Sequence, residues 1–169
     1  LFAKITSNVN QSSGKPQFQY SSTMHGDETT GYVLMLRLID SLLTSYGTNP
    51  RITNLLDKLE IWINPNANPD GTYYTGNSSV SGARRNNANG YDLNRNFPSQ
   101  PNGTNSAPRQ PETLAMMALA EGNHFVLSSN IHGGAEVMNY PWDLWSRLHP
   151  DNNWLVFISR EYVDTAQYY

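Results

Sequence analysis

The spacing of hydrophobic positions changes twice in the first third of the chain, which predicts a strand, a helix and a second strand. Polar and apolar residues alternate over residues 17–22, the pattern of a strand with one face in a core. Apolar residues then recur at helical spacing from about residue 28 to Tyr46, and Gly47 ends this predicted helix. After a short predicted helix over 51–58, residues 59–63 form a mostly apolar, β-rich run typical of a buried strand. Elements in this order predict a crossover connection and an α/β fold.

The rest of the chain extends this pattern into a mixed, mostly parallel sheet flanked by helices. Further strands are predicted over residues 1–6, 124–131 and 137–140, and further helices over residues 111–121 and 151–168. Between them, residues 64–111 are crowded with Asn, Gly, Pro, Ser and Tyr and show little apolar periodicity. Because so long a connection in a compact domain is usually functional, we expect it to carry part of a site. Disorder is the alternative, but the arginines and aromatic residues in this segment favour an ordered loop.

The composition limits the class of protein and its partners. A chain of 169 residues with 38% hydrophobic and 15% charged residues is typical of one globular domain. The net charge of -3 argues against nucleic acid or an anionic membrane surface as partner, and no apolar run is long enough to span a bilayer. The chain has no cysteine, so a metal site must use histidine and carboxylate ligands. Abundant Asn, Tyr and Trp with little Lys suit a secreted or periplasmic protein, and we expect a monomer.

His25 and Glu28 form the first candidate site, because they stand between the predicted strand over 17–22 and the helix that follows it. Ligands of open α/β sheets bind at this edge, and side chains three residues apart at a helix start can converge. By itself the His-x-x-Glu spacing is common, and a surface turn with an acid near a helix N-terminus is the simpler interpretation. His132 changes this balance, because it too follows a predicted strand and precedes two glycines. Two imidazoles and one carboxylate supply three ligands and leave a fourth position for water, the arrangement of a catalytic zinc site.

The irregular segment adds cationic side chains to this candidate site. Arg85, Asn94 and Arg95 lie close together in the sequence. Guanidinium groups bind carboxylates through paired, charge-assisted hydrogen bonds, and Asn contributes a neutral donor. A cationic clamp near a hydrolytic zinc ion suggests a substrate with a free carboxylate. Arg84, next to Arg85, is expected to be solvated.

Four motifs, in this order along the chain, resemble those of the zinc metallocarboxypeptidases, the family of pancreatic carboxypeptidases A and B. They are His25-x-x-Glu28, Asn68-Pro69-Asp70-Gly71, Asp92-Leu93-Asn94-Arg95-Asn96-Phe97-Pro98 and Asn130-Ile131-His132-Gly133-Gly134. The last two are more similar to the regulatory (N/E) branch and its bacterial secreted relatives than to the digestive branch. The resemblance extends from His25 to Trp142, which is most of the chain.

The resemblance implies a peptidase that removes C-terminal residues from peptides or proteins. It implies one zinc ion per chain, with the ligands His25, Glu28 and His132. It also implies that Asn94 and Arg95 hold the terminal carboxylate of the substrate, and that Arg85 stabilises the oxyanion of the tetrahedral intermediate.

One part of the family pattern has no match in this chain. The resemblance implies a general-base glutamate on a later strand and a substrate-capping tyrosine before it, and Glu136 and Glu161 lack that context. We therefore expect residues 1–169 to be a single, incomplete peptidase catalytic domain whose base lies beyond Tyr169.

Two other functions remain open from the sequence. Zinc amidohydrolases of the aspartoacylase and desuccinylase type share the His-x-x-Glu and His ligand set, although the motif around Arg95 fits them loosely. A catalytically incomplete module that binds peptide C-termini is the non-enzymatic alternative, and the unmatched base favours it.

Overall fold

The structure, a computed structural model, describes residues 1–11, 14–98 and 108–168 and divides into two compact units. The first unit contains the described residues up to Phe97 and those from 108 to Gly133. The second contains Pro98 and the described residues from Gly134 onward. Part of the predicted irregular segment, residues 99–107, lies outside the described residues. A single catalytic domain over 1–169 stays a prediction.

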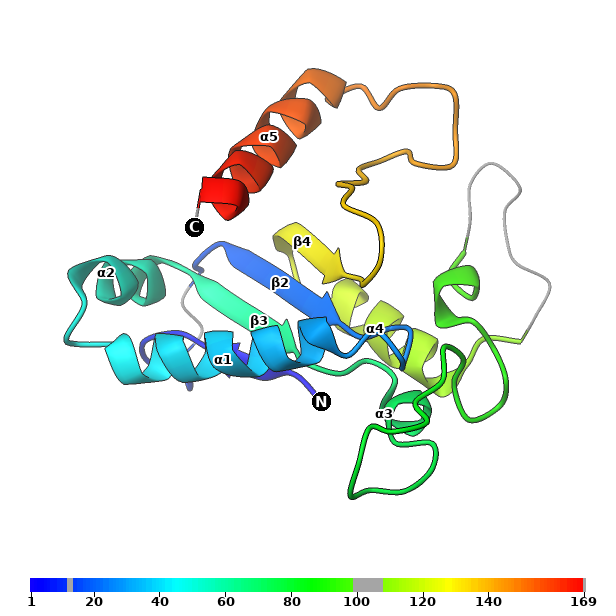
Figure 1. Ribbon diagram of the computed structural model, residues 1–169. Coiled ribbons are helices and arrows are strands. Elements are labelled where there is room, and N and C mark those ends of the chain that lie inside the picture. Colours follow the sequence, from blue (N-terminus) through cyan, green and yellow to red (C-terminus); the bar gives the residue numbers. More distant parts are fainter. Residues whose placement is uncertain (12–13, 99–107, 169) are drawn as a thin grey trace. The chain divides into compact units, whose positions relative to one another are not determined.

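The first unit is built on a four-stranded sheet with the order β1-β3-β2-β4 (Figure 1). Its strands are β1 (Ala3–Ile5), β2 (Gln17–Ser22), β3 (Glu60–Asn64) and β4 (Phe125–Ile131). β2 is parallel to both β3 and β4, whereas β1 is antiparallel to β3. The prediction of an α/β fold with a mixed, mostly parallel sheet is therefore confirmed.

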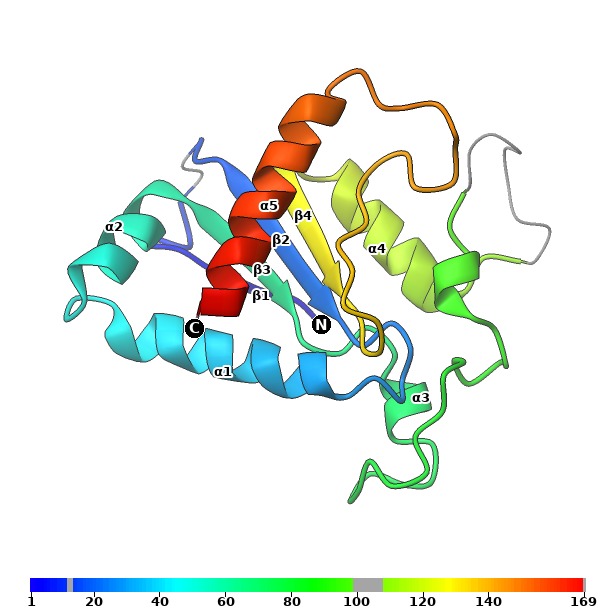
Figure 2. The same ribbon diagram turned by 45° about the horizontal axis from the view of Figure 1, so that its top comes forward.

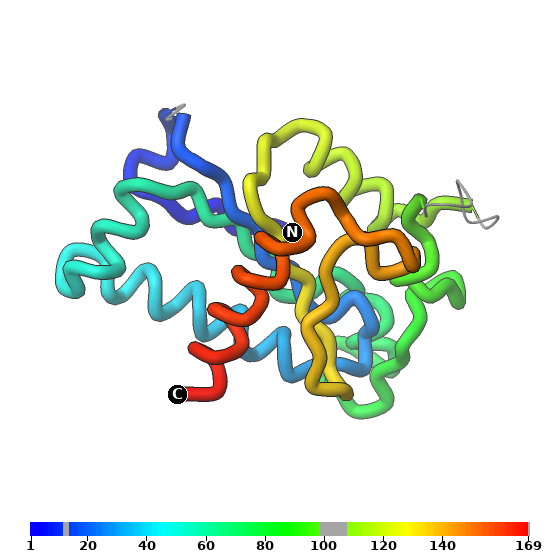
Figure 3. The backbone as a smooth tube through the Cα atoms, turned by 90° about the horizontal axis from the view of Figure 1, so that it is seen from above, coloured from blue at the N-terminus to red at the C-terminus, as the bar shows by residue number. Residues whose placement is uncertain are grey.

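Helices cover both sides of this sheet, as right-handed crossovers require when the chain moves first one way and then the other across it. The helical segments are α1 (Thr30–Ser45), α2 (Pro50–Lys58), α3 (Pro69–Thr72), the 3-10 turn η1 (Leu93–Arg95) and α4 (Pro111–Glu121). α1 and α4 lie on opposite sides of the strands (Figure 3). α2 begins at Pro50 because the Asn49 side chain accepts hydrogen bonds from the backbone N–H groups of Arg51 and Ile52.

The hydrophobic core of the first unit lies between the sheet and the helices α1 and α2. Its buried side chains are Ile5, Met35, Leu42, Leu56, Ile61 and Ile63. Burial of each such side chain stabilises the fold by about 1.5–3 kcal/mol. This core packs α1 against β3 and so stabilises the strands whose carboxyl ends carry the candidate site.

The register of the parallel strands determines which segments meet at the carboxyl ends of the strands. Ser22 at the end of β2 lies opposite Ile131 at the end of β4, and Ser21 lies opposite Asn64 of β3. Three strands therefore end side by side, with β2 between its two parallel neighbours (Figure 2). The residues that follow Ser22 and Ile131 leave the sheet together.

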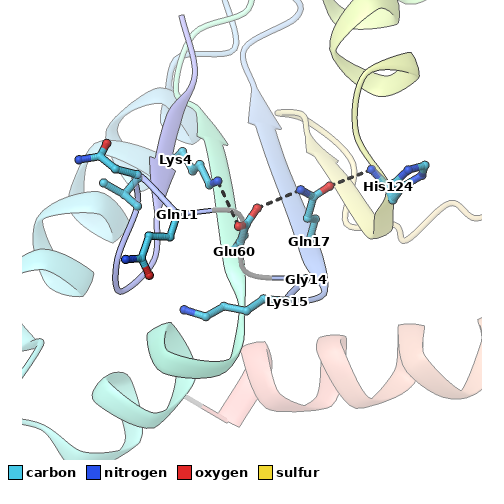
Figure 4. Close-up of a pocket in the computed structure, with 9 residues that line it drawn as sticks. Lys4, Gln11, Gly14, Lys15, Gln17, Glu60 and His124 are labelled. Atoms are coloured by element: carbon cyan, nitrogen blue, oxygen red, sulfur yellow. Dashed lines mark hydrogen bonds and ion pairs between the residues drawn. The ribbon is translucent and has the colours of Figure 1, made fainter.

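At the opposite ends of the strands, away from the candidate site, a series of polar contacts links the strands beside a hollow of about 450 Å³ (Figure 4). Glu60, with 4% of its side chain exposed, pairs with Lys4 Nζ at 3.1 Å and accepts a hydrogen bond from Gln17 Nε2 at 2.9 Å. Gln17 Oε1 in turn accepts the backbone N–H of His124, just before β4. The buried carboxylate is thus satisfied by protein groups, and its role is to hold β1, β2 and β3 at their common end.

Glu60→Ala is expected to lower the free energy of unfolding of the protein by about 2 kcal/mol, because Gln17 and Lys4 lose their buried acceptor. Lys4 is a quarter exposed and can turn to water, which keeps the loss below that of a fully buried pair. Urea unfolding measures the difference, with the exposed Glu121→Ala as the matched control. Equal stability of the two variants would contradict this role for Glu60.

The second unit contains the helix α5 (Asn152–Tyr168), which confirms the helix predicted over 151–168. The short strand predicted over 137–140 is wrong, because these residues pair with no strand among those the structure describes and run as irregular backbone. A strand is stable only when a neighbour satisfies its backbone groups. In the described part of the chain, no helix is both long enough and apolar enough to cross a bilayer.

Candidate metal centre

His25, Glu28 and His132 converge on one point beside the carboxyl ends of β2 and β4. Nδ1 of His25 lies 2.8 Å from Glu28 Oε1 and 3.1 Å from Nδ1 of His132. The same His132 nitrogen lies 2.8 Å from Glu28 Oε2. The three side chains offer ligand atoms that all lie within 4.8 Å of one another. Residues more than 100 positions apart in the sequence are therefore brought to one site by the parallel pairing of two strands.

The turn after β2 directs His25 and Glu28 into this site. Thr23 is fully buried and adopts φ +57°, a conformation that costs a β-branched residue free energy. Its hydroxyl donates a hydrogen bond to the carbonyl of Glu28 at 3.2 Å and lies 2.8 Å from the Ser22 hydroxyl. These contacts hold the residues 23–28 as a closed turn, so that both ligands face the same way.

Gly26 and Asn68 bring Arg85 to the same point. The backbone N–H of Gly26 donates to the carbonyl of Arg85, and a Cβ added at Gly26 would lie 2.5 Å from the carbonyl oxygen of Arg84. Asn68, completely buried, donates through Nδ2 to the carbonyls of Met24 and Arg85. The second sequence motif therefore joins the turn that carries His25 to the loop that carries Arg85.

The geometry of the three donors fits a tetrahedral zinc ion. Ligand atoms about 2.0–2.1 Å from zinc lie roughly 3.3 Å apart, close to the 3.1 Å between the two histidine nitrogens. His25 Nδ1 lies within hydrogen-bonding distance of Glu28, His132 and Arg85 Nη1, but one ring nitrogen has a single lone pair or a single proton. These groups cannot all be satisfied by one another, whereas a cation between them satisfies both imidazoles and the carboxylate.

Asp92 fixes the orientation of both His25 and Arg85, a role that the sequence analysis did not assign. Its Oδ1 lies 3.1 Å from His25 Nε2, and its Oδ2 accepts hydrogen bonds from Arg85 Nε and Nη2 at 3.1 and 2.8 Å. Because an ionised carboxylate only accepts hydrogen bonds, Nε2 of His25 carries the proton, and the lone pair of Nδ1 would be available to a metal ion. The sequence signal that could have indicated this role was the position of Asp92 as the first residue of the motif Asp92–Pro98.

Glu28 and Asp92 are both held in their ionised forms. Partial burial raises the pKa of each carboxyl group, but hydrogen bonds outweigh this effect and leave both pKa values below the ordinary range. Glu28 accepts the backbone N–H of Gly133 and lies in contact with the two imidazoles, and Asp92 accepts hydrogen bonds from Arg85 and His25. An ionised Glu28 is the form that a divalent cation binds.

Asn130 contacts Nε2 of His132, as Asp92 contacts Nε2 of His25. Its Nδ2 lies 3.1 Å from His132 Nε2, and its Oδ1 accepts a hydrogen bond from the Ser21 hydroxyl at 3.2 Å. A half-turn of this amide exchanges its oxygen and nitrogen, so that Oδ1 accepts the proton of Nε2. In that orientation the lone pair of His132 Nδ1 becomes available to a metal.

Comparison with known proteins decides the family of this chain. The model of the zinc carboxypeptidase family matches residues 1–169. The chain belongs to the zinc carboxypeptidase family. Mouse carboxypeptidase M is 47% identical over 138 residues, which cover 77% of this chain and 29% of that protein. Duck carboxypeptidase D is 47% identical over 131 residues, which cover 77% of this chain and 9% of that protein.

Similarity to the mouse carboxypeptidase N catalytic chain, 38% identical over 152 residues, confirms the regulatory branch that the motifs predicted. It covers 76% of this chain and 33% of that protein. The chain thus spans less than a third of the first of these relatives.

Solved structures support the fold. Thrombin-activatable fibrinolysis inhibitor superposes with a TM-score of 0.79 at 22% identity, over 95% of this chain and 45% of that one. A putative carboxypeptidase A from Shewanella denitrificans gives a TM-score of 0.61 at 29% identity, over 79% of this chain and 31% of that one.

In this member of the zinc carboxypeptidase family, the predicted carboxylate clamp lies on η1, immediately after Asp92. Asp92 Oδ1 accepts the backbone N–H of Asn94 at 2.9 Å, and Arg95 Nη1 donates to the carbonyl of Asn94 at 3.1 Å. Both residues are exposed. Asp92 therefore connects the start of η1 to His25, and the substrate-binding roles of Asn94 and Arg95 stay predictions.

Asp92→Asn is expected to weaken zinc binding by about 10–100-fold, because the neutral amide no longer sets the proton of His25 or the position of Arg85. Competition with a chromogenic chelator at pH 7 measures the zinc affinity. Asp40→Asn, an exposed acid on α1, is the matched control and leaves the affinity unchanged. Equal affinities of the two variants would refute the orienting role of Asp92.

The same substitution is expected to have a pH-dependent effect on the stability of the zinc-free protein. The folded-state pKa of Asp92 lies below its ordinary value of 3.8, so its stabilisation is present above that value and lost as the pH falls through the folded pKa. The difference in unfolding free energy between wild type and Asp92→Asn is therefore expected to shrink below pH 3.8. Urea titrations at several pH values measure it, and a difference that grows on acidification contradicts the assignment.

Proposed function

We propose that the protein hydrolyses the C-terminal peptide bond of peptides or proteins. The observation that carries this proposal is the convergence of His25, Glu28 and His132, with Arg85 Nη1 3.2 Å from His25 Nδ1. A site with three protein ligands leaves a coordination position open, as hydrolytic zinc sites do. Membership in the zinc carboxypeptidase family gives the reaction type and the peptide C-terminus as substrate.

The residues beside the ligands supply charge and orientation for the reaction. When bound, zinc supplies Lewis-acid chemistry, in that it polarises a carbonyl group and makes water a stronger nucleophile. Arg85 directs Nη1 toward the ligands while Asp92 holds its other nitrogens, so it is placed to stabilise negative charge on the carbonyl oxygen. Asn94 and Arg95 bind the terminal carboxylate of the substrate and so select the last peptide bond.

The general base of the reaction is not assigned to this chain. Glu136 and Glu161 are exposed residues of the second unit, and neither has the sequence context that the family resemblance implies for the base. A monomeric protein outside the cytoplasm completes the proposal, and the residue composition supports the location.

The test compares two forms of one peptide, a free C-terminal carboxylate and a C-terminal amide, with the intact zinc-loaded gene product. Release of the last residue from the free acid but not from the amide is the expected result, because the clamp has nothing to bind in the amide. Equal rates on both forms would refute an exopeptidase.

The same assay distinguishes the two other functions. Cleavage of N-acyl amino acids without any cleavage of peptides would identify the amidohydrolase alternative. Binding of the free-acid peptide without turnover would identify a peptide-binding module.

A further inference from the structure

A hollow of about 300 Å³ lies beside the metal centre, within the loop between α3 and η1. Its walls come from Tyr74 and from the residues 84–88 and Gly90, which include Arg84 and Arg85. Arg85 also contacts the metal ligands, whereas His25, Glu28 and His132 do not line the hollow. The hollow is therefore a separate space that shares one residue, Arg85, with the metal centre.

Arg84 is a charged group of this hollow, and no acidic side chain among the described residues pairs with it. Its guanidinium lies over the ring of Tyr74, with Cζ 3.5 Å from the ring centroid. Within residues 1–11, 14–98 and 108–168, no carboxylate or carbonyl oxygen accepts a hydrogen bond from its side chain. Stacking on an aromatic ring fixes the plane of a guanidinium and leaves the N–H groups at its edge available to a carboxylate. Arg84 is exposed, as the sequence predicted, but it is held in position rather than freely solvated.

The loop that presents Arg84 is fixed by buried hydrogen bonds. The Asn87 side chain, 4% exposed, accepts the backbone N–H groups of Asn89 and Tyr91 and donates to Gln110 Oε1. The backbone N–H of Arg84 donates to the carbonyl of Gly71 at 2.8 Å. Because these contacts hold the loop before a ligand binds, little ordering is needed when one does.

The position of the hollow determines which part of a peptide can reach it. Asn94 and Arg95, proposed to hold the terminal carboxylate, do not line it, and Arg85 lies between the hollow and the ligands. With the terminal residue at Asn94 and Arg95 and the scissile carbonyl at Arg85, the hollow is left to residues on the amino-terminal side of the scissile bond.

We infer that this hollow is a subsite for an acidic side chain upstream of the scissile bond, with Arg84 as the residue that binds its carboxylate. The inference rests on the proposed peptidase function. It predicts that the protein prefers peptides with glutamate over glutamine at one upstream position. The pair is open to solvent, so a preference of roughly fivefold is expected, and it decreases at high salt.

The experiment uses peptide pairs that differ only by Glu or Gln at each of the four positions before the scissile bond. The intact zinc-loaded protein gives kcat/KM, and fluorescence anisotropy gives the Kd of the same peptides for the zinc-free protein. Arg84→Ala is expected to remove the roughly fivefold preference through KM and to leave the rate on the Gln peptide unchanged. Arg84→Lys retains part of the preference, and Arg51→Ala, an exposed arginine at the start of α2, retains all of it.

Each outcome separates this inference from the proposed function. If peptides are cleaved but Glu and Gln forms react and bind equally at every position, the subsite is refuted while the peptidase stands. If no peptide is cleaved, the peptidase is refuted, and the anisotropy comparison of wild type with Arg84→Ala still decides whether the hollow binds an acidic side chain. A preference that persists in Arg84→Ala overturns the role of Arg84.

Discussion

His132→Ala is expected to remove stoichiometric zinc from the protein. The substitution leaves His25 and Glu28 as a two-ligand site and deletes the donor that directly follows β4. We expect zinc affinity to fall by more than the roughly 100-fold typical of losing a residue that merely orients a ligand. Zinc content after dialysis and competition with a chelator measure the change.

The matched control is His124→Ala. His124 stands at the other end of the same strand, and its backbone N–H, not its ring, makes the hydrogen bond to Gln17. This variant should keep one zinc ion per chain. Zinc retained by His132→Ala, or lost from both variants to the same extent, would contradict the assignment of His132 as a ligand.

Arg85→Ala is expected to lower kcat by about 10²–10³-fold while zinc stays bound, because a donor aimed at developing negative charge acts mainly in the transition state. Steady-state kinetics on a free-acid peptide with the intact zinc-loaded protein measure this loss. Arg37→Ala, an exposed arginine on α1, is the control and should not change the rate.

A different kinetic result for Arg85 would change its role. A rise in KM with unchanged kcat would mean that Arg85 binds the substrate in its ground state only. Loss of zinc from Arg85→Ala would show that Arg85 acts through Asp92 on His25, rather than on the reacting carbonyl.

Much of the fold could be predicted from the sequence, because its signals are local. The alternation over residues 17–22 and the apolar run over 59–63 correspond to β2 and β3, and Gly47 follows the end of α1. Burial within α1 was harder to predict. Apolar side chains of α1 divide between surface and core: Val33 and Leu36 are nearly half exposed, whereas Met35 and Leu42 enter the core. Which face of a helix meets the sheet is set by the crossover, and several faces of α1 are apolar.

The three ligands could be predicted for a similar reason, since parallel strands end at one edge and each ligand follows a strand. The contacts that position them could not. Asp92 reaches His25 across 67 residues, and Gly26 and Asn68 contact Arg85 only through its backbone carbonyl, which does not depend on the residue type at position 85. Such contacts depend on the path of a loop that has no periodic pattern. The sequence therefore identified the candidate ligands that the structure brings together, and the structure identified the groups that orient them.

The central claim is that His25, Glu28 and His132 bind one zinc ion together. An X-ray structure of the zinc-loaded protein, with data collected on both sides of the zinc absorption edge, tests it most directly. We predict one anomalous peak about 2.0–2.1 Å from Nδ1 of both histidines and about 2.0–2.2 Å from a Glu28 oxygen. A zinc peak bound elsewhere, or a fully loaded protein in which His132 lies away from the ion, would contradict the account.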